Sequence, residues 1–360
     1  MIKKIDLYII RKFLGTFIFS ILIIIVIVIV FDLAEKLDEF FENKAPFKAI
    51  ALEYYLNFIP HFANLFSSLF TFISVIFFTA KLAARTEIIA ILSSGISYRR
   101  MLLPYFISAA IIALFSYLLG SWIIPPANMI RLDFENTYIR NPYQNHDRNI
   151  HKQVAPGIYI YMDSYNTTND VAMKFSMEEF SEQGILKSKI IADYVKWDTT
   201  QQKWRIQNYY IRNFTEKGER IETGRQLDTT LNISPEDFRQ RVNIVETMND
   251  RDLNEFIEKQ IIRGESHIEI YLIEKYRRIA YPVSTFILTL MGVAVSSRKI
   301  RGGVGAHIGF GILLSFTYIL FFQISSQFAI RGNLDPFIAV WIPNILYSFI
   351  AVYLYKKAPK

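Results

Sequence analysis

The stretch FLGTFIFSILIIIVIVIVF, residues Phe13 to Phe31, contains no charged side chain and decides the fold class of this 360-residue chain. A helix of about 20 apolar residues is long enough to cross the hydrocarbon core of a bilayer. Acidic residues and a second apolar stretch follow it, and a small-residue cleavage site is missing. We therefore expect a retained membrane anchor rather than a signal peptide.

Five further stretches free of Asp, Glu, Lys and Arg have a comparable length. They are Tyr54 to Ala80, Met101 to Ile130, Ile279 to Ser297, Gly302 to Ile330 and Pro336 to Tyr355. Buried helices of soluble proteins seldom run so long without charge, and a mean hydropathy of +0.22 with 30 Phe and 21 Tyr is typical of membrane proteins. The sequence predicts six transmembrane helices in two groups of three, within residues 1–130 and 266–360.

Basic residues gather at one set of helix ends. They are Lys3, Lys4, Arg11, Lys12, Lys81, Arg85, Arg99, Arg100, Arg298, Lys299, Arg301, Lys356, Lys357 and Lys360. The acidic residues at those ends are Asp6 and Glu87 alone, whereas the loop after the first span is rich in acidic residues. Because short cytoplasmic loops carry an excess of Lys and Arg, we expect both termini in the cytoplasm and the central domain outside it. This clustering beside apolar stretches makes nucleic-acid binding a poor explanation of the net charge of +7.

Residues 131–265 follow a different pattern. Residues that favour β-strands alternate or cluster in Gly157 to Met162, Ala172 to Met177 and Lys203 to Tyr210, between turn-forming Asn, Asp and Gly. The pattern predicts a β-sandwich or an open barrel. Such a domain is either a filled sandwich that supports other subunits or an open one that binds an amphiphilic ligand. Helical spacing of apolar residues in Met248 to Tyr276 predicts a helix that leads back to the membrane.

The sequence lacks the motifs of common catalytic and metal sites. It has no cysteine, no G-x-x-x-x-G-K-[ST] phosphate loop and no H-E-x-x-H, and its five histidines are scattered. The six apolar stretches carry no charged residue of the kind that proton-coupled transporters use. We therefore expect no enzyme activity, no cofactor and no metal ion, and an energy source in a partner protein.

Residues 84–97 form the most informative cytoplasmic segment. Thr86 precedes an apolar run that ends at Gly95, and Glu87 lies where a negative charge favours a helix N-terminus. The segment is predicted to be a short amphipathic helix. Two interpretations stay open at this point: a coupling helix whose Glu87 pairs with a basic residue of a cytoplasmic ATPase, or a helix cap at the membrane surface.

Four motifs, in this order along the chain, resemble the LptF/LptG (YjgP/YjgQ) permeases. They are Arg85-Thr86-Glu87 with Gly95-Ile96-Ser97, Ile124-Pro125-Pro126-Ala127-Asn128, Leu231 to Phe238, and Arg277-Arg278-Ile279-Ala280-Tyr281-Pro282. Each motif is short, but their succession at matching places is specific. The resemblance covers the whole chain, with the same three-plus-three layout, and favours an LptG-like role.

The resemblance implies a permease subunit of the ABC transporter that extracts lipopolysaccharide, or a related glycolipid, from the bacterial inner membrane for outer-membrane biogenesis. It implies as partners a paralogous six-span subunit, a dimeric cytoplasmic ATPase and a periplasmic bridge that receives the lipid. The central domain is then expected to be a periplasmic β-jellyroll that relays lipid. Arg85, Glu87 and Gly95 become the expected ATPase-coupling residues.

The resemblance also implies that lipid enters sideways, between the first span of one subunit and the fifth span of its partner. Phe31, Phe310 and Phe321 are therefore candidate lipid-binding residues. Related permeases use basic residues at the outer end of the first span for ligand phosphates, and here Lys36 alone has that sign, beside Asp32 and Glu35. Small residues in the fifth span permit close approach of a helix or acyl chain, or packing within the chain. These are Gly302, Gly303, Gly305, Gly309 and Gly311.

Two rival functions predict different features. A mechanotransmitting ABC permease moves no lipid through its own spans and is expected to have four spans with one large outer domain, so six evenly divided spans oppose it. A membrane scaffold without a transport role would lack catalytic residues, as this chain does, and would bind neither lipid nor an ATPase.

Overall fold

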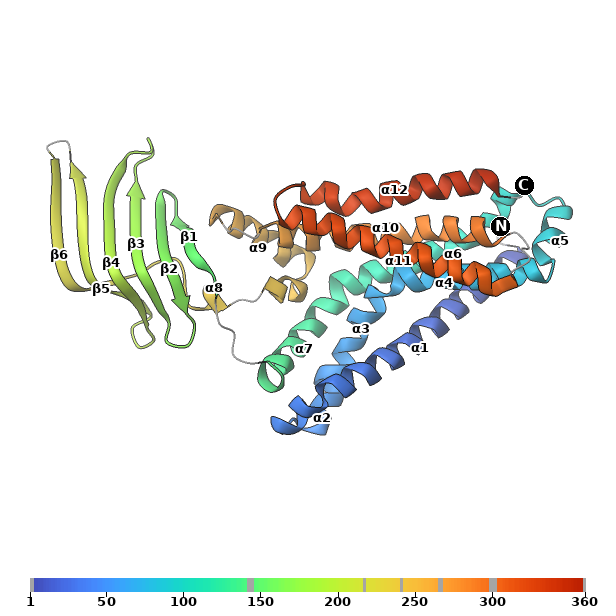
Figure 1. Ribbon diagram of the computed structural model, residues 1–360, viewed down its shortest axis with the longest axis horizontal. Helices are drawn as coiled ribbons and strands as arrows, with labels where there is room; N and C mark the ends of the chain where they lie inside the picture. The colour runs from blue at the N-terminus through green and yellow to red at the C-terminus, as the bar shows by residue number, and fades with distance from the viewer. Residues whose placement is uncertain are drawn as a thin grey trace. The chain divides into compact units, whose positions relative to one another are not determined.

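The computed structural model describes residues 3–140, 146–215, 218–239, 242–264, 268–297 and 303–358. These residues form two compact units, a helical unit and a β unit (Figure 1). The helical unit comprises Met1–Ile139, Val245–Arg251 and Glu269–Lys360, and the β unit comprises Arg140–Ile244 and Asp252–Ile268. The β unit is therefore an insertion between two groups of helices.

The helical unit is built from long helices joined by short ones. Its elements are α1 (Lys4–Glu42), α2 (Phe47–Ala49), the π-helix η1 (Ile50–Tyr55), α3 (Leu56–Leu65), α4 (Ser67–Ala84), α5 (Glu87–Ser93), α6 (Tyr98–Leu118), the π-helix η2 (Leu119–Ile123), α7 (Ile124–Tyr138), α10 (Ile268–Ser296), α11 (Gly303–Ile330) and α12 (Pro336–Lys357). Within the described part of the chain, six helical segments are long and apolar enough to cross a membrane, three before the β unit and three after it. This confirms the predicted number and grouping of the spans.

The second and first spans show two ways in which the helices differ from their predicted extent. The second, Tyr54 to Ala80, is not one helix, because α3 ends at Leu65 and α4 begins at Ser67. Pro60 weakens α3 from within, since proline lacks the amide hydrogen of a regular helical bond. At 1.5 Å per residue the 39 residues of α1 extend about 58 Å, against about 30 Å for the hydrocarbon core. Helix α1 therefore continues well beyond the apolar stretch that predicted it.

Helix α4 lies at the centre of the helical unit. In its most apolar window 61% of the residues are buried, against 11% for α1 and 28% for α11. Helix α1 packs on α4 and α6, and α11 packs on α4 and α12. The crossings with α4 are close, because a Cβ added at Gly292 of α10 would lie 2.9 Å from Val75, and one at Gly311 of α11 would overlap Ile76. Helices α1 and α11 leave most of their apolar surface outside this core.

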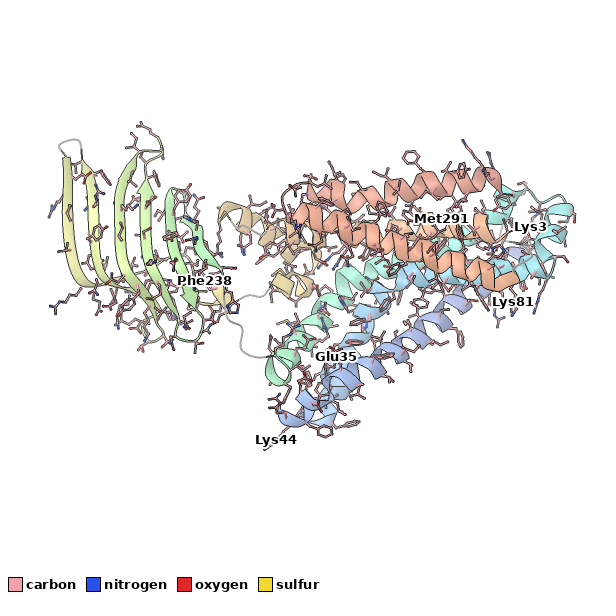
Figure 2. All side chains as sticks on the ribbon, viewed as in Figure 1. Lys3, Glu35, Lys44, Lys81, Phe238 and Met291 are labelled. Atoms are coloured by element: carbon pink, nitrogen blue, oxygen red, sulfur yellow. The ribbon has the colours of Figure 1, made fainter. Side chains whose placement is uncertain are left out.

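The helix ends that were predicted to face opposite sides of the membrane do lie at opposite ends of the helical unit. Figure 2 places Lys3 and Lys81 at one end, and Glu35 and Lys44 at the other. The basic end holds the start of α1, the end of α4 and the whole of α5 (Figure 1).

The β unit contains one antiparallel sheet. Its described strands are β1 (Arg148–Ala155), β2 (Ile158–Asn166), β3 (Val171–Phe180), β4 (Leu186–Asp198), β5 (Lys203–Thr215) and β6 (Gly218–Thr229). Each strand pairs with the next, in the order β1-β2-β3-β4-β5-β6. An inserted β domain is confirmed, and the described strands form a meander rather than the two packed sheets of a sandwich. Short turns such as the one between β1 and β2 explain this order, because they can join only neighbouring antiparallel strands.

The first part of the segment after the sheet, residues 231–239, packs back onto it. The whole segment contains α8 (Glu236–Arg239), the 3₁₀ helix η3 (Val242–Thr247) and α9 (Asp250–Ile262). Trp204 of β5 donates a hydrogen bond from its ring nitrogen to the backbone oxygen of Ile233, at 2.8 Å. The ring of Phe238 stacks on Tyr165 at a centroid distance of 4.2 Å. The Leu231 to Phe238 motif therefore completes the apolar core of the β unit.

Candidate functional site

The predicted coupling helix is α5, a seven-residue helix at the basic end of the helical unit. Its Ile88 side chain is buried, whereas Ile89 is 60% exposed, so the helix is amphipathic. Gly95 follows the helix in a left-handed conformation, with φ of 84°, which glycine adopts without strain. The structure therefore has a short amphipathic helix at Glu87–Ser93, within the predicted segment 84–97 and followed by Gly95.

Thr86 does not cap α5 in the expected way. It has a left-handed backbone conformation, with φ of 62°, and its side chain forms no capping bond. Its hydroxyl instead donates to the backbone oxygen of Arg85, at 2.6 Å. A β-branched residue in this conformation is strained, so the turn before α5 is held by its surroundings rather than by local preference.

The structure brings the three predicted coupling residues together on α5 and its two flanking turns. Arg85 and Gly95 are exposed, and Glu87 is half-buried. Oε2 of Glu87 accepts a hydrogen bond from the hydroxyl of Tyr8 on α1, at 3.1 Å. A carboxylate accepts several hydrogen bonds, so this bond is compatible with a further partner for Glu87.

The other candidate residues lie on two exposed apolar helix surfaces. Phe31 on α1 is 72% exposed, and Phe310 and Phe321 on α11 are each close to half exposed. Further large exposed side chains on these helices are Ile18, Phe19, Leu22, Val26 and Val30 of α1, and Leu313, Phe316, Ile324 and Phe328 of α11. Contiguous apolar surfaces of this kind belong against lipid or another protein chain.

The glycines of α11 divide between two environments. Gly311 meets Ile76 of α4, so it serves packing within the chain. Gly305 and Gly309 have no other atom within 4 Å of an added Cβ, so they face open space. Gly302 lies outside the described residues. The surface of α11 at Gly305 and Gly309 is therefore available to a helix or an acyl chain.

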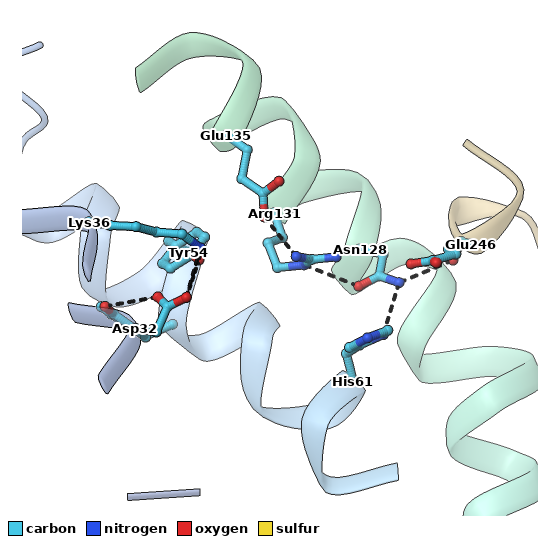
Figure 3. Close-up of polar contacts among 9 residues, drawn as sticks. Asp32, Lys36, Tyr54, His61, Asn128, Arg131, Glu135 and Glu246 are labelled. Atoms are coloured by element: carbon cyan, nitrogen blue, oxygen red, sulfur yellow. Dashed lines mark hydrogen bonds and ion pairs between the residues drawn. The ribbon is translucent and has the colours of Figure 1, made fainter. Parts of the chain in front are cut away.

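Lys36 is engaged within the chain. Its Nζ lies 2.7 Å from Oδ1 of Asp32 and also contacts the hydroxyl of Tyr54 (Figure 3). The hydroxyl of Tyr55 donates to Oδ2 of the same Asp32, at 3.2 Å. No described contact joins Lys36 to Phe310 or Phe321. A ligand phosphate would therefore have to replace Asp32 as the partner of Lys36.

A buried polar cluster lies beside Asp32 and Lys36. The sequence indicated no function for this cluster. Asn128 and Arg131 of α7 are buried, and the guanidinium of Arg131 contacts Oε1 of Glu135 at 2.7 Å and Oδ1 of Asn128 at 3.3 Å (Figure 3). The amide of Asn128 lies 3.5 Å from Nδ1 of His61 and donates to the backbone oxygen of Glu246, at 3.4 Å. Four segments, α3, α7, η3 and α10, contribute to this cluster.

The α10 side of the cluster contains the predicted Arg277-Arg278 motif. Arg277 pairs with Glu274, and Arg278 contacts Asp250 at 2.8 Å and Glu274 at 3.3 Å. Arg278 also donates to the backbone oxygen of Val245, at 3.2 Å. These bonds fix the start of α9 and the end of η3 on α10.

The cluster lines a partly open cavity of about 50 Å³. Its lining includes His61, Asn64, Asn128, Glu246, Glu274 and Arg277. Such a volume admits a few water molecules and not an acyl chain. Burial, together with the charge of Glu274, raises the pKa of Glu246, and Arg277 opposes this rise. The cavity is therefore a small polar pocket where these segments meet, and it is too small for an acyl chain.

The sequence motifs that contain these residues indicated the family and did not indicate that the residues form a cluster. Asn128 ends the Ile124 to Asn128 motif, and Arg277 and Arg278 begin the motif that opens the fourth span. The charged residues lie just outside the uncharged stretches by which the spans were predicted, at positions where α7 and α10 continue beyond them. Hydropathy therefore could not reveal that they are buried.

In the described part of the chain, six helices long and apolar enough to cross a membrane and an inserted antiparallel sheet define a multi-pass membrane protein with a β domain. The sequence matches the family described as "Lipopolysaccharide export system permease LptF/LptG" over residues 7–357, and the chain belongs to this family. It is therefore a transport subunit of a lipopolysaccharide export complex, resident in the inner membrane, rather than an enzyme. No curated protein matches the chain.

Proposed function

We propose that this chain is one permease subunit of an ABC transporter that takes lipopolysaccharide from the inner membrane and passes it to a periplasmic bridge. The observation that carries the proposal is the unequal burial of the six spans. In the most apolar stretch of each helix, 11% of the residues of α1 and 28% of those of α11 are buried, whereas 61% of those of α4 are buried. A paralogous six-span subunit would supply the second wall of a path that runs between these exposed helices.

Lipid enters this path sideways from the membrane, between α1 of one subunit and α11 of its partner. Both surfaces are apolar and rich in large side chains, which suits acyl chains. Gly305 and Gly309 leave space on α11 for close approach. Phe31, Phe310 and Phe321 are the proposed contacts with acyl chains, and Lys36 remains the proposed contact with phosphate, in exchange for Asp32.

A dimeric cytoplasmic ATPase supplies the energy through α5. Glu87 is the proposed partner of a basic residue of the ATPase, with Arg85 and Gly95 shaping the docking turn. Support comes from the exposure of Arg85 and Gly95 and from the place of α5 at the basic end of the helical unit.

Both termini and α5 lie in the cytoplasm in this proposal, and the β unit lies in the periplasm and relays lipid. The chain contains no native cysteine, so single cysteines can report the orientation. In intact spheroplasts a membrane-impermeant maleimide should label Gln183→Cys, in the turn between β3 and β4, and should label Ser94→Cys only after lysis. Labelling of Ser94→Cys before lysis would contradict the orientation.

The proposal is tested by gentle purification of the tagged chain from its native membranes, followed by mass spectrometry of proteins and lipids. We expect a soluble ATPase, a second six-span subunit and a lipopolysaccharide-type glycolipid. Glu87→Ala should lower ATPase recovery, whereas the control Ser93→Ala, at the exposed end of the same helix, should not. Recovery of the chain alone with bulk phospholipid would favour the scaffold function.

A further inference from the structure

Two polar contacts hold the cytoplasmic end of α1 to the segment that contains α5. The first joins Tyr8 to Glu87, at the first residue of α5. The second joins Asp6 to Arg100, in the first turn of α6 and five residues after Gly95. The same end of α1 is therefore attached on both sides of α5.

The contact between Asp6 and Arg100 is a partly buried, two-pronged ion pair. Nη1 and Nη2 of Arg100 lie 2.7 and 2.5 Å from Oδ1 and Oδ2 of Asp6. Asp6 is 1% exposed, and its Oδ2 also accepts the backbone amide of Lys3, at 2.7 Å. A guanidinium that binds both oxygens of a carboxylate fixes the relative orientation of the two groups as well as their distance.

This attachment stands out because, from here to the contacts of Asp32 with Tyr54 and Tyr55, the described part of α1 is held by apolar contacts. In its most apolar stretch 11% of the residues are buried, the smallest share among the six spans of the described chain. Apolar helix contacts permit small sliding movements, whereas a two-pronged ion pair must either move as a unit or break. A displacement of α5 would therefore reach α1 through Tyr8 and Asp6 in addition to the apolar packing of Ile88.

We propose that Asp6 and Tyr8 are positioning residues that transmit the movement of α5 to α1, and so connect ATPase docking to the wall of the lipid path. This inference rests on the proposed function. Neither residue is among the proposed contacts with the lipid or the ATPase. Each acts through another side chain, Asp6 through Arg100 and Tyr8 through Glu87.

The test uses the complete transporter in nanodiscs and measures ATP hydrolysis and ATP-dependent release of lipopolysaccharide in the same samples. Asp6→Asn and Tyr8→Phe should leave the hydrolysis rate close to wild type and lower lipid release per ATP at least about five-fold, the lower end of typical coupling between sites. The reversed pair, Asp6→Arg with Arg100→Asp, should restore release relative to either single reversal. A structural role alone would lower both activities through loss of assembled complex.

Matched controls come from two residues of the same types that lack these contacts to α1. Arg99→Ala removes a charge beside Arg100, from a side chain that bonds the hydroxyl of Tyr355. Tyr353→Phe removes the hydroxyl of another exposed tyrosine, on α12. Both should keep wild-type release per ATP.

Tyr8→Phe deletes a single oxygen at an exposed position, so it tests the inference even if Asp6→Asn lowers the yield of complex. Wild-type release per ATP in Tyr8→Phe and Asp6→Asn, beside a Glu87→Ala complex that has lost its ATPase, would overturn this inference and leave the proposed function intact. Absence of ATP-dependent release from the wild-type complex would overturn both.

Discussion

Trp204 joins strand β5 to the segment that follows the sheet. Its ring nitrogen is buried and donates to the backbone oxygen of Ile233. Trp204→Phe keeps most of the apolar contact but leaves this oxygen without its donor, which should lower the free energy of unfolding by about 1–3 kcal/mol. Denaturant unfolding of the full chain in detergent, followed by tryptophan fluorescence, measures the change.

Trp197→Phe is the matched control for this prediction. Trp197 packs edge-on against Trp204 on the neighbouring strand, and its ring nitrogen meets no acceptor among the described residues. Its substitution should cost clearly less than Trp204→Phe. Equal losses for the two variants would show that packing, and not the hydrogen bond, carries the effect.

Glu246 makes stability depend on pH. Its pKa is raised because burial and Glu274 disfavour the carboxylate. A group with a raised folded-state pKa stabilises the fold fully below its unfolded pKa, about 4.3 for glutamate, and this contribution is lost as pH rises through the folded pKa. Glu246→Gln stays neutral at every pH, so it should unfold at a higher temperature than the wild type at about pH 8.

The difference between Glu246→Gln and the wild type should shrink as the pH is lowered towards about 4, because the wild-type side chain then becomes neutral as well. Thermal unfolding in a pH series, followed by circular dichroism, provides the measurement. The exposed Glu53→Gln is the control and should show no such trend. A constant difference across the series would mean that charge is not its cause.

Single residues show where the sequence was sufficient and where it was not. Gly95 could be predicted, because its left-handed turn follows from a rule about helix ends. The partner of Lys36 could not be predicted. Asp32 and Lys36 form an i,i+4 pair because α1 continues as a helix past Phe31, where the predicted span ends. The bond between Tyr8 and Glu87 joins residues 79 positions apart, so no local pattern could indicate it.

At the scale of helices, the crossing of α4 with α10 depends on a glycine. A Cβ at Gly292 would lie 2.9 Å from Val75 and 3.1 Å from the ring of Phe72, and both side chains are fully buried. Gly292→Ala should therefore destabilise the protein by about 1–3 kcal/mol through overpacking. The loss is measured as a lower midpoint of thermal unfolding in detergent.

Gly309→Ala is the matched control, since the same methyl group meets open space on α11. It should leave the unfolding midpoint unchanged or raise it slightly, because alanine favours helix over glycine. If Gly309→Ala proved as harmful as Gly292→Ala, the cost would arise from the membrane environment of the helices and not from the crossing.

Among the elements, the spans were predictable and their irregularities were not. Hydropathy identifies a long apolar helix without reference to its neighbours, so six spans followed from the sequence. The break between α3 and α4 and the π-helical turns η1 and η2 depend on local packing and prolines. In the sheet, Lys174 and Asn208 have positive φ within β3 and β5, which strand-forming patterns do not indicate.

At the scale of the whole molecule, the family motifs mark the cluster that joins the helical segments. Asn128, Arg277 and Arg278 come from two motifs more than 140 residues apart, and they line one cavity together with Glu246 and Glu274. Sequence reasoning could place each motif at a helix end. It could not place them in one cluster, because this requires the packing of α7 against η3 and α10.

The proposed lipid path predicts where lipopolysaccharide contacts the transporter. A photo-cross-linking residue at Phe19 of α1 or Phe316 of α11 should form lipopolysaccharide adducts in living cells. Phe349 of α12 is the control, because it is also exposed but lies on a helix outside the proposed path. Immunoblots for lipopolysaccharide on the purified chain measure the adducts.

The comparison with Phe349 separates transport from simple immersion in lipid. All three side chains are exposed and apolar, so bulk membrane lipid would reach each of them to a similar extent. Adducts at Phe19 and Phe316 should also increase when ATP hydrolysis is blocked by an ATPase variant, because substrate then remains in the path. Equal adducts at Phe349, or adducts that do not respond to the ATPase, would place lipopolysaccharide elsewhere and leave α1 and α11 as ordinary lipid-facing helices.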